Sequence, residues 1–292
     1  MSIWDGLFQG IIQGATEFLP ISSDGHLTLY QHLTGNSGEG ALFFNLMLHL
    51  GTLVAVFVAY RKDIWALIKT FFAMVGDIFR GKFSFKTKDE NRRMIFMFVM
   101  ACVPLLAFLL VKDWVTAITE DDDIVVEGFC FLWTAVLLFL ASKCVKGRKT
   151  AREMKVRDAL VVGVFQGTAI MPGISRSGST ISSGLLLGFS KEYCVKFSFI
   201  LGIPAILGAS VLEAKDAFAA GLEIEWAPVL VGIVTAAVVG YLCIRLIQYL
   251  VASDKFIIFS YYTAALGVVT LAAGILEHAW GSNIVELVSR LF

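Results

Sequence analysis

Six long apolar runs constrain this chain more than any other feature of its sequence. A helix needs roughly 20 apolar residues to cross a hydrocarbon core about 30 Å thick. Runs of about that length lie near residues 41–60, 93–111, 124–142, 192–212, 227–249 and 257–275. Only 16% of the residues are charged, against roughly a quarter in soluble domains, so the apolar surface requires lipid. The sequence therefore predicts an all-α, polytopic membrane protein with six transmembrane helices.

Two further apolar stretches, 2–33 and 157–189, are interrupted midway by polar and helix-breaking residues. The interruptions lie at 20–25 in the first stretch and at 172–178 in the second. Each pattern indicates two half-helices joined by a polar turn. Irregular backbone is tolerated at membrane depth only where protein or a water-filled cavity surrounds it. We therefore predict two re-entrant helical hairpins in addition to the six spans.

The charges of the connecting segments predict how the chain crosses the membrane. Lys and Arg accumulate on the cytoplasmic side, and the segments 61–93 and 143–157 are rich in both. The segments 113–123 and 213–225 carry mainly Asp and Glu, which places them outside. The first hairpin then enters from the outside and the second from the inside. Within the first basic segment, the alternation of apolar and basic residues at 62–80 predicts an amphipathic helix on the membrane surface.

The two interrupted stretches resemble each other, which predicts an internal repeat. Gln13-Gly14 aligns with Gln166-Gly167, Ile21-Ser22 with Ile174-Ser175, and Gly25 with Gly178, all at one constant offset, and Leu50-Gly51 resembles Leu201-Gly202 slightly further on. Each half has one hairpin followed by three spans, and an odd number of spans inverts the second half. We predict a single membrane domain, 1–292, with inverted halves 1–150 and 151–292 whose broken helices meet near the midplane.

Ionisable and hydroxyl side chains gather in the two polar turns, where their cost inside a membrane makes them functional candidates. Glu17 lies one helical turn after Gln13, so the pair can share a cation or a water. Arg176 suits phosphate, because its planar fork binds two oxygens while free N–H groups of a helix start bind others. The turns also hold Ser22, Ser23, Asp24, His26, Ser175, Ser177, Ser179 and Thr180. Serine and threonine at helix starts can equally be N-caps.

Three other features narrow the chemistry. His32 and His49 have no acidic or hydroxyl neighbour in a turn, so we predict a structural role for both. The formal net charge is zero, so no overall basic field favours nucleic acid, and none is predicted as a partner. The five cysteines lack the spacing of a redox motif or a zinc site, so they are predicted to be packing residues.

The runs 13–26 and 172–180 closely resemble the two signatures of bacterial undecaprenyl-diphosphate phosphatases, the bacitracin-resistance family. The resemblance covers essentially the whole chain in length and hydropathy. It implies hydrolysis of undecaprenyl diphosphate to undecaprenyl phosphate and inorganic phosphate, which recycles the carrier lipid for cell-wall synthesis. It also implies a divalent cation, Mg²⁺ or Ca²⁺, and a bacterial plasma-membrane location with the site open toward the outer face. Gln13 is an allowed variant of Glu in the first signature, and Asp24 takes a place often held by a small or hydroxyl residue.

The same resemblance implies roles for individual residues. The catalytic residues would be Glu17, His26, Ser23 and Arg176; the phosphate ligands Ser22, Ser175, Arg176, Ser177 and Thr180; and the metal ligands Glu17 and Gln13. The attacking group stays open between Ser23, His26 and water.

A transporter or flippase of a polyprenyl phosphate lipid is the alternative function, because inverted repeats with broken helices are also a transporter plan. A carboxylate, an imidazole and hydroxyls beside Arg176 favour hydrolysis, since a carrier needs the guanidinium but no nucleophile. The expected partners are the polyprenyl diphosphate and membrane lipid, and a homodimer stays open as an assembly.

Overall fold

The computed structural model describes residues 2–35, 39–82, 84, 89–111, 114–115, 123–144, 147–219, 225–253 and 255–281. Within these ranges the chain forms eleven α-helices and one short 3₁₀ turn, Ala151–Glu153. The helices are α1 Ile3–Phe18, α2 Ser23–Thr34, α3 Glu39–Ala59, α4 Arg61–Phe79, α5 Glu90–Leu109, α7 Val125–Ser142, α8 Val156–Thr168, α9 Arg176–Leu186, α10 Lys191–Ala219, α11 Trp226–Ala252 and α12 Ile257–Trp280.

Each of the six predicted spans coincides with a helix. By length and composition α5, α7, α10, α11 and α12 can cross a membrane. Helix α3 qualifies jointly with α4, from which it is bent by 89°. The prediction of an all-helical, polytopic membrane protein is therefore confirmed. The bend separates α3 from the segment predicted to form the surface helix, which is α4.

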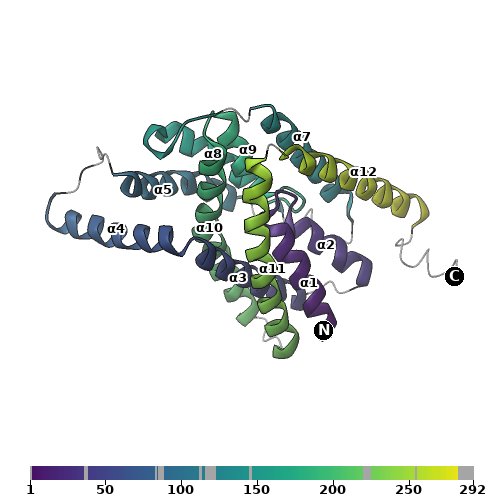
Figure 1. Cartoon of the computed structure of the whole chain (residues 1–292). Coiled ribbons are helices and arrows are strands. Elements are labelled where there is room, and N and C mark those ends of the chain that lie inside the picture. Colours follow the sequence, from purple (N-terminus) through teal and green to yellow (C-terminus); the bar gives the residue numbers. More distant parts are fainter. Residues whose placement is uncertain are drawn as a thin grey trace.

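The interrupted stretches form the helix pairs α1–α2 and α8–α9. The gaps lie at 19–22 and 169–175, a few residues before the predicted breaks at 20–25 and 172–178, so most of the polar residues lie in the first turns of α2 and α9. Figure 1 shows α10 and α11 crossing the centre of the molecule, with α4 and α5 extending to one side and α7 and α12 to the other. The α1–α2 pair lies beside α11, and α8 and α9 lie near the upper end of α10 in this view. The two pairs thus occupy the middle of the molecule.

Glycines bring α1 and α8 close to their partner helices. A Cβ atom on Gly14 of α1 would lie 2.7 Å from the Ala236 carbonyl oxygen of α11. A Cβ atom on Gly163 of α8 would lie 2.2 Å from the Ala101 carbonyl oxygen of α5. Backbones can approach this closely only where small residues line the contact, as is common between membrane helices. Both pairs are therefore held in place by tight backbone packing.

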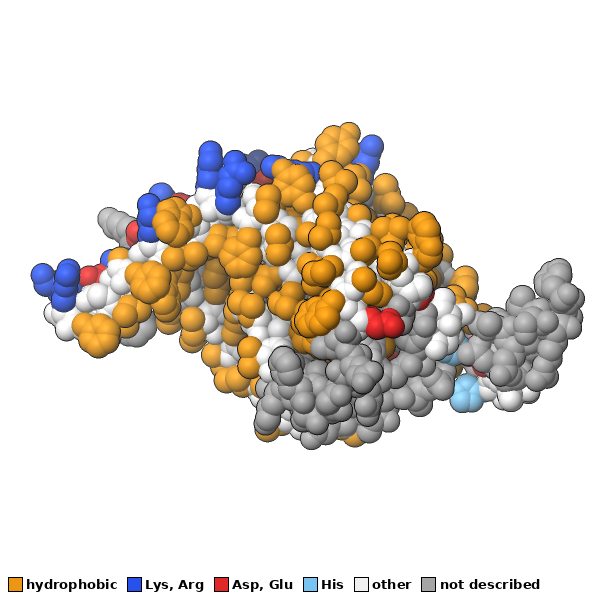
Figure 2. All heavy atoms as spheres, turned by 90° about the horizontal axis from the view of Figure 1, so that it is seen from below, with side chains coloured by type: hydrophobic (Ala, Val, Ile, Leu, Met, Phe, Trp, Pro, Cys, Tyr) orange, Lys and Arg blue, Asp and Glu red, His pale blue; other side chains and the backbone are white. Residues whose placement is uncertain are grey.

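Large apolar side chains such as Phe72, Leu230 and Val269 are exposed, and Figure 2 shows apolar groups over much of the visible surface. A surface of this kind suits lipid rather than water. Lys and Arg side chains gather along one edge of the same view. Of the acidic segments predicted to face outside, 113–123 lies for the most part outside the described residues. In the other, 213–219 continue α10, and 220–224 lie outside the described residues.

Candidate active site

The two interrupted turns lie against each other. A Cβ atom on Gly25 of α2 would lie 2.8 Å from the Cα of Gly173, and one on Gly178 of α9 would lie 3.2 Å from the Pro20 carbonyl oxygen. Side chains projecting from the two turns therefore share one small volume. Residues far apart in the sequence meet there.

Local hydrogen bonds hold each turn. The Ser22 hydroxyl caps α2 by accepting from the Gly25 N–H, with Ser22 itself at a φ of 72°, a conformation that is costly for any residue with a Cβ. In the second turn, Ser175 caps α9. The Ser175 N–H also donates to the Thr134 hydroxyl of α7 at 3.1 Å, and that hydroxyl donates to the Gly173 carbonyl at 3.0 Å. Helix α7 thus clamps the second turn.

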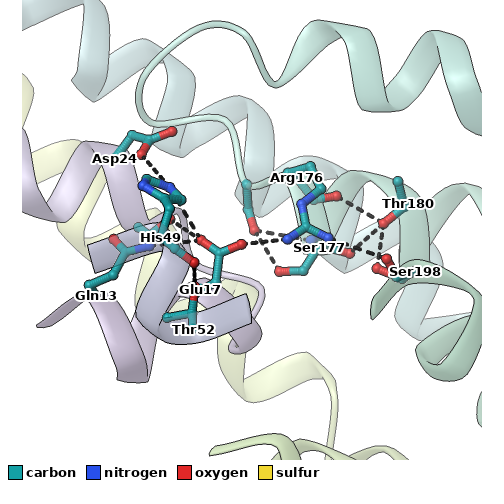
Figure 3. Close-up of polar contacts among 12 residues, drawn as sticks. Gln13, Glu17, Asp24, His49, Thr52, Arg176, Ser177, Thr180 and Ser198 are labelled. Atoms are coloured by element: carbon teal, nitrogen blue, oxygen red, sulfur yellow. Dashed lines mark hydrogen bonds and ion pairs between the residues drawn. The ribbon is translucent and has the colours of Figure 1, made fainter. Parts of the chain in front are cut away.

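An ion pair joins the two turns. Arg176 Nη2 of α9 donates to Glu17 Oε1 of α1, and Figure 3 shows the two side chains pointing at each other. Arg176 Nη1 donates to the Ser198 carbonyl of α10 at 3.2 Å. A Cβ atom on Gly202 would lie 2.3 Å from Nη1, so the lack of a side chain there makes room for the guanidinium. The Glu17 residue is only 6% exposed, so this is a largely desolvated pair.

The second carboxylate oxygen of Glu17 accepts from two neighbours. The Ser23 hydroxyl donates to Oε2 at 2.7 Å and the Gln13 amide at 3.1 Å. Of the predicted site residues, Gln13, Glu17, Ser23 and Arg176 are thus in one hydrogen-bonded group. A carboxylate that accepts from a hydroxyl beside a guanidinium can take the proton of that hydroxyl while the guanidinium holds an anion.

Three of the predicted phosphate ligands, Ser175, Ser177 and Thr180, lie at the start of α9. The hydroxyls of Ser175 and Ser177 lie 3.3 Å apart. The Thr180 hydroxyl lies 2.6 Å from the Ser198 hydroxyl and donates to the Arg176 carbonyl at 2.9 Å. The four hydroxyl residues Ser175, Ser177, Thr180 and Ser198 are buried. Their hydroxyls have partners within the protein, so a phosphate would have to exchange with those partners.

His26 lies apart from the Glu17 group. Its Nδ1 is 2.6 Å from the Ser22 carbonyl oxygen and its Nε2 is 2.8 Å from the Tyr262 hydroxyl of α12. Its ring stacks on Tyr262 and meets Phe131 edge to face. The ring that was predicted to be catalytic is therefore directed toward α12 and α7.

Sequence neighbours gave no reason to connect His49 with the site, but its ring lies in it. His49 Nε2 is 3.3 Å from Asp24 Oδ1 and 3.7 Å from Glu17 Oε2. Both acidic partners come from other helices, which is why the sequence around His49 is uninformative. One indirect signal in the sequence could have found it. His49 directly precedes Leu50-Gly51, which resembles Leu201-Gly202, and Gly202 lies against Arg176. His32 also has an acidic partner, Glu277 Oε1 at 3.0 Å.

Oxygen donors for a cation are few. Within the described residues no group of three or more His, Cys, Asp and Glu is arranged to hold a metal ion. The buried Oε1 of Gln13 has no hydrogen-bond partner among the described atoms, while the Nε2 of the same amide donates to Glu17. Mg²⁺ is commonly bound by one or two protein oxygens together with waters and substrate phosphates. The donor set fits a cation held in that manner and does not form an all-protein cage.

Comparison with known proteins places this chain in a family. Residues 6–269 match the family model described as "Bacitracin resistance protein BacA". The chain is 38% identical over 278 residues to a protein of Alkaliphilus metalliredigens, with 94% of this chain and 100% of the relative covered. It is 38% identical over 275 residues to a Methanosphaera stadtmanae protein (93% and 98% covered) and 39% over 270 residues to one from Desulfosudis oleivorans (92% and 97%). All three relatives are named undecaprenyl-diphosphatase. The chain therefore belongs to the bacitracin resistance protein BacA family.

Proposed function

We propose that this membrane protein is an undecaprenyl-diphosphatase, which hydrolyses undecaprenyl diphosphate to undecaprenyl phosphate and inorganic phosphate. The observation that carries the proposal is the buried contact of Glu17 with both Ser23 and Arg176. It joins a hydroxyl, a carboxylate that can accept its proton, and a guanidinium suited to phosphate. Family membership and the names of the full-length relatives support the same reaction. The activity returns the carrier lipid to cell-wall synthesis and underlies bacitracin resistance.

Arg176 binds the terminal phosphate of the lipid in this proposal. Its planar fork matches two phosphate oxygens, and it is the first residue of α9, whose free N–H groups favour an anion. The hydroxyls of Ser22, Ser175, Ser177 and Thr180 line the same turns as further ligands. Phosphoryl transfer depends mostly on positioning and on neutralising charge, which this surrounding supplies.

Ser23 is the nucleophile that the geometry favours, because its hydroxyl already donates to Glu17 at 2.7 Å. Glu17 takes the proton as Ser23 Oγ bonds to the terminal phosphorus, and the anhydride P–O bond breaks to release undecaprenyl phosphate. Water then cleaves the phosphoserine and releases inorganic phosphate, so one difficult step becomes two. Direct attack by water, or by His26 after its ring leaves Tyr262, are the alternatives. Trapping of radioactive phosphate on Ser23 in denatured protein would separate them.

A divalent cation, Mg²⁺ or Ca²⁺, is the proposed cofactor. Glu17 and Gln13 would hold it, and the unpartnered Oε1 of Gln13 supports this. When bound, such a cation neutralises charge on the phosphate oxygens. The protein's own share is to keep two oxygen donors one helical turn apart on α1 and out of water.

The proposed architecture is an inverted repeat of two re-entrant hairpins and six spans, with halves 1–150 and 151–292. Equivalent glycines support it: Gly14 of α1 meets α11 of the other half, and its aligned residue Gly167 of α8 meets Phe108 of α5. Each first hairpin helix thus packs on a span of the opposite half. The contact between the two turns supports a shared site near the midplane.

The proposed location is the bacterial plasma membrane, with the site open toward the outer face. The basic edge in Figure 2 supports an inside position for that edge.

Labelling of single cysteines, introduced into a background without the five native ones, tests this orientation. Cysteines replacing Asp122 and Glu223, which lie outside the described residues, should react from the outside. Cysteines replacing Lys149 and Lys86, the latter also outside the described residues, should react only after the membrane is opened. Labelling at Lys86 and Glu223 from the same side would overturn the inverted repeat.

Release of inorganic phosphate separates the proposed enzyme from a transporter or flippase of a polyprenyl phosphate lipid. Detergent-purified protein given a polyprenyl diphosphate and Mg²⁺ should release phosphate. A protein that only carries the lipid would bind it and release none. The bond between Ser23 and Glu17 favours hydrolysis, because a carrier has no need of an activated hydroxyl. The elution volume of the same preparation in size-exclusion chromatography tests the homodimer.

A further inference from the structure

The base of the second hairpin, where α8 begins and α9 ends, is held by basic residues. The Lys149 N–H donates to the Gly188 carbonyl at 3.1 Å, and its Nζ donates to the Leu187 carbonyl, just after α9, at 2.8 Å. Arg93 of α5 donates from Nε and Nη2 to the Met154 carbonyl, just before α8, at 3.1 and 2.6 Å. Basic side chains therefore contact both ends of the hairpin.

These side chains line a pocket of about 590 Å³. Pockets of roughly 300–1,000 Å³ hold small ligands, so the space is large enough for a phosphate-bearing group. Two of the lining residues are acidic, Glu153 and Asp158, and five are basic: Arg93, Lys149, Arg152, Lys155 and Arg157. The lining thus carries three positive charges in excess. Like charges around one space repel each other, and a bound anion removes that repulsion.

The two acidic lining residues are used by the backbone. Glu153 Oε2 accepts from the Thr150 N–H at 3.0 Å, and Asp158 Oδ2 accepts from the Lys155 N–H at 2.9 Å. Across the part of the chain that the structure describes, neither the Lys155 nor the Arg157 side chain is paired with a carboxylate, and both residues are exposed. Arg157 is the second residue of α8, whose first N–H groups also favour an anion. Two cations are therefore available to a ligand.

The pocket is separate from the candidate active site. Helix α8 has 13 residues, and a helix rises about 1.5 Å per residue, so its two ends lie about 20 Å apart. The pocket lies at the start of α8, whereas the polar turn follows its end. One phosphate cannot occupy both places.

Apolar side chains beside the pocket favour a lipid as the source of the phosphate. Val156, the first residue of α8, is 39% exposed, and Leu186, the last residue of α9, is 41% exposed. Exposed apolar side chains of a membrane protein suit acyl chains rather than water. Figure 2 shows apolar groups directly beside the basic edge of the molecule. A lipid can use both features, whereas a free phosphate uses only the charge.

We propose that the pocket at the base of the second hairpin binds the phosphate of an anionic membrane lipid, with Lys155 and Arg157 as its charge partners. Basic pockets between transmembrane helices take headgroups of this kind. The bound headgroup lies between the start of α5 and the start of α8, so it braces the second hairpin. The inference does not depend on the proposed hydrolysis, because none of the lining residues belongs to the candidate active site.

Binding of a pyrene-labelled phosphatidylglycerol to the purified full-length protein in a non-ionic detergent tests the inference, with energy transfer from tryptophan as the signal. Pyrene-labelled phosphatidylcholine is the reference lipid, since its choline cancels the phosphate charge, and it should bind more weakly. The double variant Lys155→Gln/Arg157→Gln should weaken binding of the anionic lipid about tenfold or more. Each basic group near a membrane surface contributes roughly fivefold.

The matched control is Arg61→Gln/Lys62→Gln. It removes the same two charges from the exposed start of α4, outside the pocket, and should change binding of the anionic lipid less than about twofold. If the double variant at Lys155 and Arg157 does not fold, Arg157→Gln alone makes the same comparison, with an expected weakening of roughly fivefold.

Three outcomes overturn the inference. Equal weakening by both double variants would mean that the lipid responds to overall surface charge, and that the basic residues only orient the chain in the membrane. Equal binding of the two lipids by the wild-type protein would mean that the pocket does not select an anion. Displacement of the labelled phosphatidylglycerol by equimolar inorganic phosphate would assign the pocket to a free anion instead of a lipid.

Discussion

The two hairpins, α1–α2 and α8–α9, end their turns with the same cap. Ser22 accepts from the Gly25 N–H at 3.4 Å, and Ser175 accepts from the Gly178 N–H at 3.0 Å. The aligned serines and glycines therefore have the same local use in both halves. The first N–H groups of any helix lack acceptors within that helix. Where the helix begins inside a protein, a capping serine supplies one such acceptor.

The position after the cap is where the hairpins differ. Ser23 follows the cap in the first and Arg176 follows it in the second, and both donate to Glu17. Glu17 itself aligns with Ile170, so the acid belongs to the first hairpin alone. The two aligned positions are thus directed at one carboxylate. The first hairpin has a hydroxyl at this position, which can attack phosphorus, and the second has a guanidinium, which can bind phosphate.

Glu17→Gln removes the group on which both equivalent positions converge, and we expect the largest effect from it. Phosphate release should fall by about 10³-fold or more, because a general base alone contributes roughly 10²–10⁴ and the contact with Arg176 is weakened as well. The remaining activity should depend less on Mg²⁺. Normal turnover by a folded Glu17→Gln protein would assign the base and metal ligand elsewhere.

Arg176→Lys tests the other side of the comparison. A point charge replaces a planar fork with two parallel N–H donors. Loss of one well-placed hydrogen-bond donor to the reacting group typically costs roughly 10²–10³ in rate, so turnover should fall about 10²-fold. Phosphate release by protein that elutes as one symmetrical peak is the measurement. Near-normal turnover would remove Arg176 from the site.

The spans and breaks of this fold were predictable because their signal is local. The predicted run 93–111 corresponds to Glu90–Leu109, and the predicted break at 20–25 to the gap between Phe18 and Ser23. Length and apolarity decide a span, and polar or helix-breaking residues decide a break. The groups on the two turns were found for the same reason.

The surroundings of the turns were not predictable in the same way. Ser198 and Gly202 contact Arg176 from within α10, and His49 reaches Asp24 from within α3. Each lies inside a long apolar run, where one polar or small residue resembles an ordinary packing residue of a membrane helix. Which helix faces which is set by tertiary packing.

The aligned glutamines sharpen the comparison. Gln13 donates to Glu17 at 3.1 Å, whereas neither amide atom of the buried Gln166 has a hydrogen-bond partner among the described atoms. Gln13→Leu should lower turnover roughly tenfold, because a hydrogen bond to a charged group contributes about 1.5–3 kcal/mol. Gln166→Leu should leave turnover unchanged and not destabilise the protein. A large loss of stability in Gln166→Leu would mean that its amide is satisfied by water.

The smallest expected effect separates the two caps by backbone conformation. Ser22 has a φ of 72° and Ser175 a φ of −71°, so only the first stores strain that glycine would relieve. Glycine at a cap costs only a few tenths of a kcal/mol relative to serine, its added chain entropy costs about 0.5–1, and strain at an unfavourable φ is of order 1–3. At the middle of these ranges, Ser22→Gly should stabilise the protein by about 1 kcal/mol, and Ser175→Gly should destabilise it by about 1 kcal/mol. Thermal unfolding of both variants in one detergent measures the difference. Shifts of the same sign and size would mean that the two turns are under equal strain, and that the conformation of Ser22 has no part in how the first hairpin differs from the second.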